Sequence, residues 1–503
     1  MINKKPGIFS VIALNIGTMV GSGWLFAPLH VAQVAGGAAI LAWIIGALLA
    51  LCLSLLLAEI AIKYPVNALF TRIISLSHNP HFGSVTALAN WILGLIIVPS
   101  EAIATTQYLS SAYPAWSNLF FAAGNLTWLG VLITIFFIFI YFMINYFGIK
   151  FLSRINNVIA FAKFVIPIFS ALIIAAAAFH TQNFTVYRHQ FMPYGTSSIF
   201  TAITTSGIFY SFFGFQIAAT FTAELDNPKR NIPIALASSV ILVLVIYLLV
   251  QIAFIGALPT ALIGQGWQTL DFQSPFVYLT GLLGLNFLTV ILYADSGLSP
   301  GGTGLVYLGA TARMLNSMVK LKQAPAMLGN ASVNFSKRAL FVSFVAGAVL
   351  VVFFRNWALI AKFISTFILI ACAALPVAYA RISGTDGTLE VKLLPFAKTI
   401  SLVSFLTLSY LLILVGTSDL AIALVVHLTF FTFYAYSRTR KLAQFYRYFA
   451  SAWTIFVYLV TALLFAYWLN TANAHSWYAY MIFLLVNTVL YSALIGQKSY
   501  IDT

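Results

Sequence analysis

A cluster of small residues interrupts the first apolar segment of this chain, residues 8–31, and could create a polar site inside a membrane. The residues concerned are Gly17, Gly21, Ser22 and Gly23. Glycine is a poor helix former, and backbone groups freed by a break are tolerated in a bilayer only where they face protein or water. A half-helix beginning near Trp24 would direct its N–H groups and positive dipole end at an anion such as a carboxylate. The alternative is a packing cluster, since small residues also let helices approach closely.

Three ionisable side chains fall inside predicted apolar segments: Lys163, Glu101 and Asp295. Charge is costly in a bilayer, so the first interpretation of each is functional. Lys163 lies about six residues into its segment, roughly 9 Å along a helix, so its ammonium could instead reach the cytoplasmic surface. Glu101 and Asp295 could accept a proton or line a binding site. Alternatively, they are structural carboxylates that are capped by serines or paired with each other.

The elements that would position these residues are membrane spans of about 20 apolar residues each. Apolar runs predict fourteen of them, at about 8–31, 36–62, 85–112, 127–148, 155–180, 198–223, 232–257, 276–312, 339–354, 357–381, 397–416, 418–437, 450–469 and 476–496. Aromatic residues near span ends fit interfacial belts: Trp43, Trp128, Trp267, Tyr434 and Trp477. We therefore predict an all-α polytopic membrane protein.

Composition supports this class, because 62% of the 503 residues are hydrophobic and only 7% are charged. Of the 25 Lys and Arg residues, 21 fall on one side of the predicted spans, which places both termini in the cytoplasm. The net charge of +15 thus reflects topology and predicts no nucleic-acid partner. Two cysteines and seven scattered histidines indicate neither a disulfide framework nor a metal site. No cofactor is expected.

Internal symmetry is the next signal. The sixth predicted span carries small residues at its middle, Ser206, Gly207 and Ser211, followed by Gly214. Interrupted helices five spans apart are typical of an inverted 5+5 repeat in transporters. We predict a transporter core at 1–395, with repeats at about 8–180 and 198–381, and four additional C-terminal transmembrane helices at 396–503.

Three motifs then resemble one family. The first span contains Gly-x-x-x-Gly-Ser-Gly at 17–23, and residues 224–233 read Glu-x-x-Asn-Pro-x-Arg-x-Ile-Pro after Gly-Phe-Gln at 214–216. The third motif lies in the eighth predicted span, where residues 295–304 read Asp-Ser-Gly-Leu-Ser-Pro-Gly-Gly-Thr-Gly. The span ends in Thr-Ala-Arg-Met-Leu at 311–315. Together they resemble the amino acid–polyamine–organocation permeases, and among these the bacterial proton-coupled acidic amino acid symporters. The chain departs from the family at 64–69, which lacks a Gly-Gly pair, at Gln216, where many relatives have Glu, and in two spans beyond the common twelve.

The resemblance implies a leucine-transporter-type fold and a set of roles. The substrate carboxylate would meet Gly21, Ser22 and Gly23, and its ammonium would meet backbone carbonyls near Phe209, Tyr210 and Ser211. Tyr210, with Phe212, would act as a gate, although this aromatic run could simply pack in the bundle. Lys163 would occupy the place of the sodium ion of sodium-coupled relatives, and with Glu101 and Asp295 would serve proton coupling. Apart from the resemblance, Glu224, Asp226 and Arg230 lie at the cytoplasmic end of the sixth predicted span, where they would form an inner latch or loop brace rather than a substrate site.

These inferences predict a secondary active transporter of the inner (cytoplasmic) membrane that imports an amino acid by alternating access and proton symport, driven by the proton gradient. The acidic substrate rests on the resemblance alone, and the oligomeric state is open. One alternative is an amino acid/amine exchanger. Another is a non-transporting membrane sensor or accessory subunit. A channel is disfavoured because no span is rich in aligned charges, and an enzyme because no nucleophile, base or metal ligands cluster.

Overall fold

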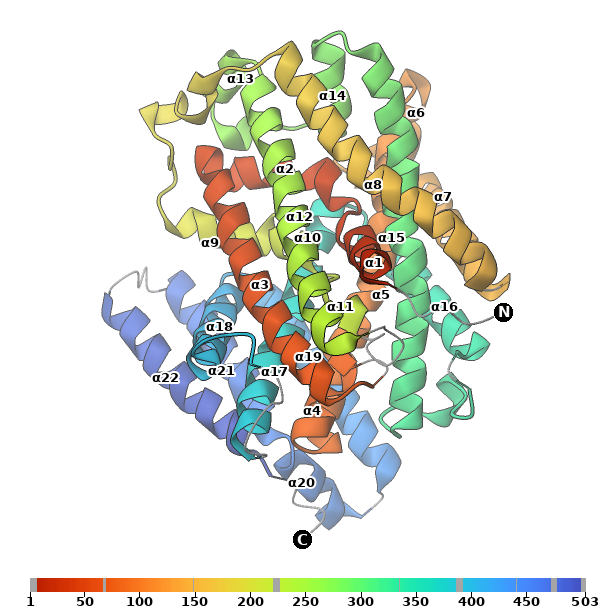
Figure 1. Ribbon diagram of the computed structural model, residues 1–503, viewed down its shortest axis with the longest axis vertical. Helices are drawn as coiled ribbons and strands as arrows, with labels where there is room; N and C mark the ends of the chain where they lie inside the picture. The colour runs from red at the N-terminus through yellow and green to blue at the C-terminus, as the bar shows by residue number, and fades with distance from the viewer. Residues whose placement is uncertain are drawn as a thin grey trace.

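The structure, a computed structural model, describes residues 7–66, 69–147, 149–219, 227–333, 335–385, 392–439, 441–471 and 477–498. These residues form a bundle of helices (Figure 1). The only strands among them are the two-residue β1 (Phe121–Ala122) and β2 (Asn125–Leu126), which pair antiparallel. The all-α class is therefore confirmed.

The helices of the first half are α1 (Ile8–Met19), α2 (Gly23–Ala35), α3 (Ala39–Lys63), α4 (Leu69–Ser77), α5 (Pro80–Ser111), α6 (Pro114–Phe120), α7 (Trp128–Phe147), α8 (Ile149–Ala177), α9 (Ser197–Thr205), α10 (Ile208–Phe212) and α11 (Gln216–Ala219). Those of the second half are α12 (Pro228–Ala257), α13 (Thr260–Gly264), α14 (Pro275–Leu282), α15 (Asn286–Lys320), α16 (Lys337–Phe353), α17 (Trp357–Thr385), α18 (Ala397–Ile413), α19 (Thr417–Arg438), α20 (Leu442–Ala450), α21 (Trp453–Thr471) and α22 (Trp477–Gly496). Short 3₁₀ turns are η1 (Gly36–Ala38), η2 (Thr181–Phe184), η3 (Tyr187–His189), η5 (Trp267–Thr269) and η6 (Ala326–Leu328).

Nine helical segments of the described chain are long and apolar enough to cross a membrane, among them α5, α12 and α17. The segments also include Gly23–Lys63, which runs through η1 as one stretch. Two shorter apolar helices, α1 and α18, add to them. The protein is thus a polytopic membrane protein, as its composition indicates.

Two predicted boundaries need correction. The predicted span 85–112 begins earlier, at Pro80, because the side chain of Asn79 caps α5 by accepting the His81 and Phe82 N–H groups at 3.0 and 2.8 Å. The predicted span 276–312 is wrong, because the chain breaks between α14 and α15, where Gly284 takes a φ of +67°. By contrast, the predicted separation of 339–354 from 357–381 is confirmed by α16 and α17.

Some of the predicted interfacial belt is also wrong. Trp128 and Trp477 are exposed, at 63% and 78%, but Trp43, Trp267 and Tyr434 are buried. Trp43 stacks on Tyr247, with ring centroids 4.4 Å apart, and donates to Gln251 Oε1 at 2.9 Å. Trp43 lies near the start of α3, Trp267 in a 3₁₀ turn and Tyr434 near the end of α19, and all three pack inside the protein. Proximity to a span end therefore does not by itself place a residue at the lipid interface.

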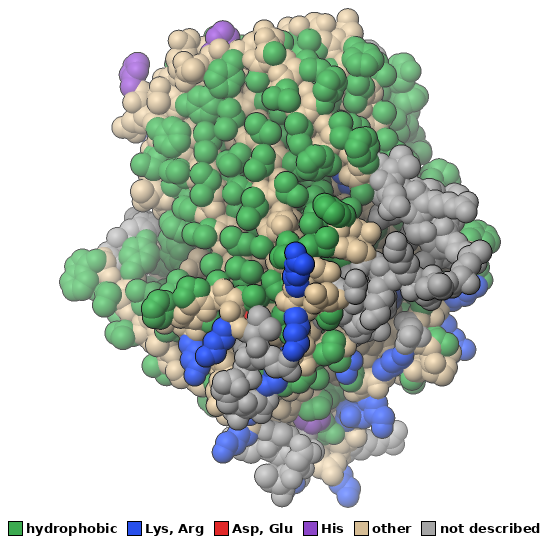
Figure 2. All heavy atoms as spheres, in the orientation of Figure 1, with side chains coloured by type: hydrophobic (Ala, Val, Ile, Leu, Met, Phe, Trp, Pro, Cys, Tyr) green, Lys and Arg blue, Asp and Glu red, His purple; other side chains and the backbone are tan. Residues whose placement is uncertain are grey.

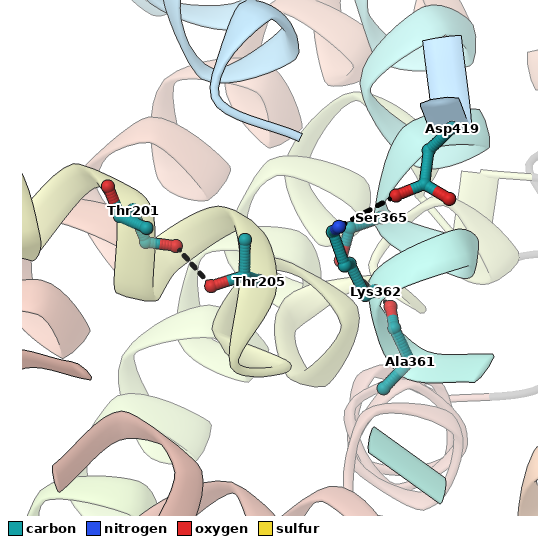
Figure 3. A network of polar contacts seen from close by, with 6 residues as sticks. All are labelled: Thr201, Thr205, Ala361, Lys362, Ser365 and Asp419. Carbon is teal, nitrogen blue, oxygen red and sulfur yellow. Dashed lines mark hydrogen bonds and ion pairs between the residues drawn. The ribbon is translucent and has the colours of Figure 1, made fainter. Parts of the chain in front are cut away.

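Helix packing brings the two halves of the chain together. The interrupted pair α1 and α2 lies inside the bundle, where α1 contacts α8, α12 and α15. α15 runs along α5, and α17 packs against both α5 and α18. The ion pair between Lys362 Nζ and Asp419, at 2.9 Å, joins α17 to the start of α19 (Figure 3).

Figure 2 shows apolar and basic side chains on different parts of this face of the molecule. Apolar side chains cover the upper part of this face, and Lys and Arg side chains gather over its lower part. The lower end of the bundle carries α4 and α20, whereas α6, α13 and α14 lie at the opposite end (Figure 1). The basic end and the end bearing α6 are therefore opposite poles of the molecule.

Candidate functional site

The interruption of the first span lies between α1, which ends at Met19, and α2, which begins at Gly23. All residues of the break are buried. A Cβ atom on Gly21 would lie 2.6 Å from Glu101 Oε1 and 2.8 Å from Thr303 Oγ1, and one on Gly23 would overlap Ser211 Oγ. The glycines therefore mark a backbone break and a close approach of neighbouring side chains at the same point.

The second interruption lies in the sixth predicted span. α9 ends at Thr205, Gly207 takes a φ of +89°, and α10 follows for five residues. The chain then becomes extended at Phe213, whose N–H is shared between the carbonyls of Phe209 and Tyr210, both at 3.1 Å. Gly214, with a φ of +149°, follows. Spans 1 and 6 are both discontinuous, and Thr18 Oγ1 joins them by donating to Gly214 O at 3.3 Å.

Carbonyls freed by the first break find partners on other helices. The last carbonyls of a helix lack intrahelical N–H partners and must be satisfied elsewhere. Tyr247 OH on α12 donates to Met19 O at 3.1 Å, and Thr303 Oγ1 on α15 lies 3.3 Å from Gly17 O. The break is thus held open by side chains of α12 and α15.

Lys163 is the strongest of these partners. Its side chain is 1% exposed, and its ammonium donates to Gly17 O at 2.6 Å and to Thr303 Oγ1 at 2.5 Å. The ammonium therefore lies between α1 and α15 and does not extend to the surface.

Glu101, on α5, also lies against the break. Its Oε2 accepts the Ser22 N–H at 2.8 Å, and its Oε1 accepts the Tyr210 hydroxyl. Tyr210 OH also lies 3.1 Å from Ser100 Oγ and 3.4 Å from Ser22 Oγ. One buried carboxylate thus connects the two interrupted spans, and it occupies the N–H group at which a substrate carboxylate is expected.

Asp295 has separate partners. It accepts from Ser299 Oγ at 2.7 Å and from Trp24 Nε1 at 3.1 Å. Its carboxylate is therefore satisfied by a serine one turn away and by the second residue of α2. Glu101 and Asp295 thus have separate hydrogen-bond partners among the described residues.

The predicted aromatic residues occupy different environments. Phe209 and Phe212 are buried, and Phe212 packs against Trp43 and Tyr247, with ring centroids 5.8 and 6.1 Å apart. Tyr210 alone of the three reaches the polar cluster. Its ring centroid lies 6.2 Å from that of Trp357.

Trp357 is a site residue that the sequence did not single out. Its Nε1 donates to Ser22 Oγ at 2.8 Å, and its ring stacks on Phe26 and His30 at centroid distances of 4.9 and 5.6 Å. The available signal was a lone tryptophan at the start of a predicted span, directly after the Arg355–Asn356 junction. That signal gives no partner, because Ser22 lies 335 positions away.

The predicted inner latch falls partly outside the described residues, which omit Glu224 and Asp226. Lys229 and Arg230 lie in the first turn of α12. No group of three or more metal-binding side chains gathers within the described part of the chain.

The family model for amino acid permeases matches residues 7–491. The chain is 34% identical over 393 residues to the glutamate/serine transporter AimA of Bacillus subtilis, covering 77% of this chain and 73% of that protein. It is 28% identical to the aspartate-proton symporter of the same organism, covering 76% and 74%. Identity to the cadaverine/lysine antiporter of Escherichia coli strain K12 is 25%, covering 51% and 55%.

Proposed function

The chain belongs to the amino acid permease family of the amino acid–polyamine–organocation superfamily, and from this premise we propose that it imports an amino acid by proton symport. The observation that carries the proposal is the meeting of two interrupted helices at one buried cluster, with Glu101 bonded to both and Lys163 beside the first. Such breaks place backbone donors and acceptors at the middle of a membrane, where a zwitterion needs both.

Substrate binding follows from the ends of these helices. The N–H groups of Gly21, Ser22 and Gly23 receive the substrate carboxylate, as a helix N-terminus favours an anion. The carbonyls at the end of α10, in Phe209, Tyr210 and Ser211, receive the ammonium. The relatives named for glutamate, serine and aspartate support a small polar or acidic amino acid as the substrate.

Proton coupling is proposed to act through the carboxylate that already holds the Ser22 N–H. Hydrogen bonds to an ionised acceptor are about twice as strong as those to a neutral one. Protonation of Glu101 therefore weakens its hold on Ser22 and frees the donor for the substrate carboxylate. Lys163 and Asp295 complete the coupling group, because Lys163 bonds α1 to α15 and Asp295 bonds α15 to α2.

Orientation in the membrane is part of the proposal. The excess of Lys and Arg at the pole of α4 and α20 supports a cytoplasmic location for that pole and for both termini. The pole of α6 then faces outward. We assign fourteen crossings, a 5+5 repeat within the core of residues 1–395, and a C-terminal extension of four transmembrane helices.

The test is uptake of radiolabelled amino acids into proteoliposomes under an imposed inward proton gradient. Aspartate, glutamate, serine, a branched-chain and a basic amino acid form the panel, with Lys163→Ala beside the wild type. We expect gradient-driven accumulation that Lys163→Ala loses, while counterflow between identical substrates survives. Uptake that ignores the gradient but needs substrate preloaded inside would favour the exchanger. Binding without flux for every substrate would favour a sensor or accessory subunit.

A further inference from the structure

α20 is a short helix between the C-terminal spans α19 and α21, and it lies at the lower end of the bundle (Figure 1). Four of the ten residues from 438 to 447 are Lys or Arg. Arg438, Lys441 and Arg447 belong to the described residues, and all three are exposed. The one acidic residue between 392 and 498 is Asp419, which lies about 28 Å from Arg438 along α19 and pairs with Lys362. No carboxylate within residues 392–498 therefore neutralises the charge around α20.

Exposed aromatic side chains place α20 at the level of the membrane surface. Tyr436, near the end of α19, is 62% exposed, and Trp453, the first residue of α21, is 48% exposed. Tyr446, on α20 itself, is 65% exposed. Tyr and Trp that are exposed at the ends of spans lie preferentially among lipid headgroups. Because α20 connects two such ends, we expect its basic side chains to lie at headgroup depth.

The two faces of α20 differ in character. Phe445 and Phe449 are four residues apart, so they share one face of the helix, and their ring centroids lie 5.1 Å apart. Phe449 packs against Phe431 of α19, with ring centroids 5.0 Å apart. Arg447 lies roughly opposite this aromatic face, because each residue turns the helix by about 100°. The aromatic face thus packs against the protein, and the face of Arg447 points away from it.

α20 and its flanking residues also contact the start of α5. Tyr448 packs edge-on against the ring of His81, with centroids 4.6 Å apart. Directly after α20, Ser451 O accepts from Asn79 Nδ2 at 3.2 Å, and Asn79 is the N-cap residue of α5. On α19, Tyr434 OH lies 2.9 Å from His81 Nδ1. The position of α20 is therefore linked to the first turn of the helix that carries the carboxylate of the central cluster.

We propose that Arg438, Lys441 and Arg447 bind the headgroups of anionic phospholipids, and that this contact fixes α20 against the start of α5 and so activates transport. The inference rests on the proposed function, which puts α20 at the cytoplasmic surface. That surface is anionic and attracts clusters of Lys and Arg, whereas zwitterionic headgroups carry no net charge. A lipid fits better than a soluble polyanion, because the exposed aromatic residues beside the cluster also need an apolar environment.

The binding test is thermal unfolding in detergent with added phosphatidylglycerol or phosphatidylcholine. We expect phosphatidylglycerol to raise the melting temperature of the wild type by about 3 °C more than phosphatidylcholine does. The double variant Lys441→Gln/Arg447→Gln should lose at least half of this difference. The matched control, Lys392→Gln/Lys398→Gln, removes two exposed lysines near the start of α18 and should keep it. An equal loss in the control, no loss in the α20 variant, or equal stabilisation by inorganic phosphate would overturn the lipid surface.

The link to α5 is tested by uptake of serine and glutamate into liposomes with and without phosphatidylglycerol. We expect the anionic lipid to raise the initial rate about threefold in the wild type and much less in Lys441→Gln/Arg447→Gln. Tyr448→Ala removes the contact with His81 but keeps the charges, so it should retain the lipid-dependent stabilisation and lose the rise in uptake. Uptake that does not depend on the lipid, or a full rise in Tyr448→Ala, would overturn the link. Stabilisation by the lipid in a protein without flux would uphold the lipid surface and count against the proposed transport function.

Discussion

At the scale of single residues, Glu101 occupies the donor that the proposed substrate requires. Its carboxylate holds the Ser22 N–H at 2.8 Å and also accepts from Tyr210. A carboxylate from a substrate can use the same N–H only if Glu101 weakens its bond or moves. This competition links substrate entry to the charge on one side chain.

Glu101→Gln tests this link, because an amide of similar shape stays neutral at every pH. We expect the variant to retain counterflow but to lose acceleration of uptake by an inward proton gradient. The measurement is initial uptake of serine and glutamate into proteoliposomes with and without the gradient. Gradient-driven accumulation equal to that of the wild type would remove Glu101 from the coupling group.

Trp357 shows how a single side chain can serve two regions. Its nitrogen bonds Ser22 in the central cluster, while its ring stacks on Phe26 and His30 of α2. Movement of this indole would change both at once. Of the two residues predicted to form a gate, Tyr210 lies beside Trp357 of α17. Phe212 instead packs against Trp43.

At the scale of elements, the break in the sixth span depends on Gly207. Its φ of +89° disfavours any residue with a Cβ, and a Cβ there would lie 3.0 Å from Trp357 Cη2. Gly195 has a similar φ of +78° but no described atom within 4 Å of the added Cβ. Alanine at position 195 would therefore introduce backbone strain alone, whereas alanine at position 207 would introduce strain and crowding together.

Gly195→Ala is expected to lower the free energy of unfolding by about 1–2 kcal/mol, the cost of the left-handed conformation. Gly207→Ala should cost more, since crowding against Trp357 adds to the same strain. Thermal unfolding of the two variants in one detergent gives the comparison. An equal loss of unfolding free energy in both variants would show that the Trp357 ring moves away from the added Cβ without a cost in stability.

The turn between α4 and α5 carries His78, whose protonation differs between the folded and the unfolded protein. Burial, with the nearby Arg381 guanidinium, lowers the pKa of His78 from 6.5 to about 3. The folded protein thus keeps His78 neutral, whereas the unfolded chain takes up a proton below about pH 6.5. The neutral ring contributes stability in full above that pH, and the contribution is lost as the pH falls toward 3.

His78→Gln should therefore reduce the pH dependence of stability. Between pH 7.5 and pH 5 we expect the melting temperature of the wild type to fall further than that of the variant. The measurement is a thermal melt at several pH values in one detergent and at constant ionic strength. Parallel pH profiles for the two proteins would contradict this role for His78.

At the scale of the whole molecule, α17 ties the core to the C-terminal helices. Lys362 Nζ and Asp419 form an ion pair at 2.9 Å between α17 and α19 (Figure 3). Farther along α17, Arg381 donates to Gln497 O, beyond the end of α22, at 3.0 Å. One helix thus holds the C-terminal helices at both of its ends.

The Lys362–Asp419 pair is expected to contribute little to stability, because the two side chains are 37% and 20% exposed. A double-mutant cycle with Lys362→Met and Asp419→Asn should give a coupling free energy of about 0.2–1 kcal/mol, smaller at high salt. Thermal unfolding of the four proteins at low and high salt provides it. A coupling several times larger would indicate that the pair is more desolvated than its exposure suggests.

The class of the protein, the two helix breaks and the ionisable residues within spans could all be predicted from the amino-acid sequence. These features are local, since apolar runs, glycines and charges are read within about 20 residues. Lys163, Glu101 and Tyr210 could be named in this way. Motif order along the chain was enough to predict the family, which the comparisons confirm.

Which of these groups contact one another could not be predicted from the sequence, because it depends on how the helices pack. The contact between Ser22 and Glu101 spans 79 positions, and the contact between Ser22 and Trp357 spans 335. No local pattern encodes such a pairing, because it depends on how α2, α5 and α17 pack in three dimensions. The same reason explains the buried Trp43, which looked interfacial. The sequence gives the position of each polar group along the chain, whereas the packing of the helices determines which groups form hydrogen bonds with each other.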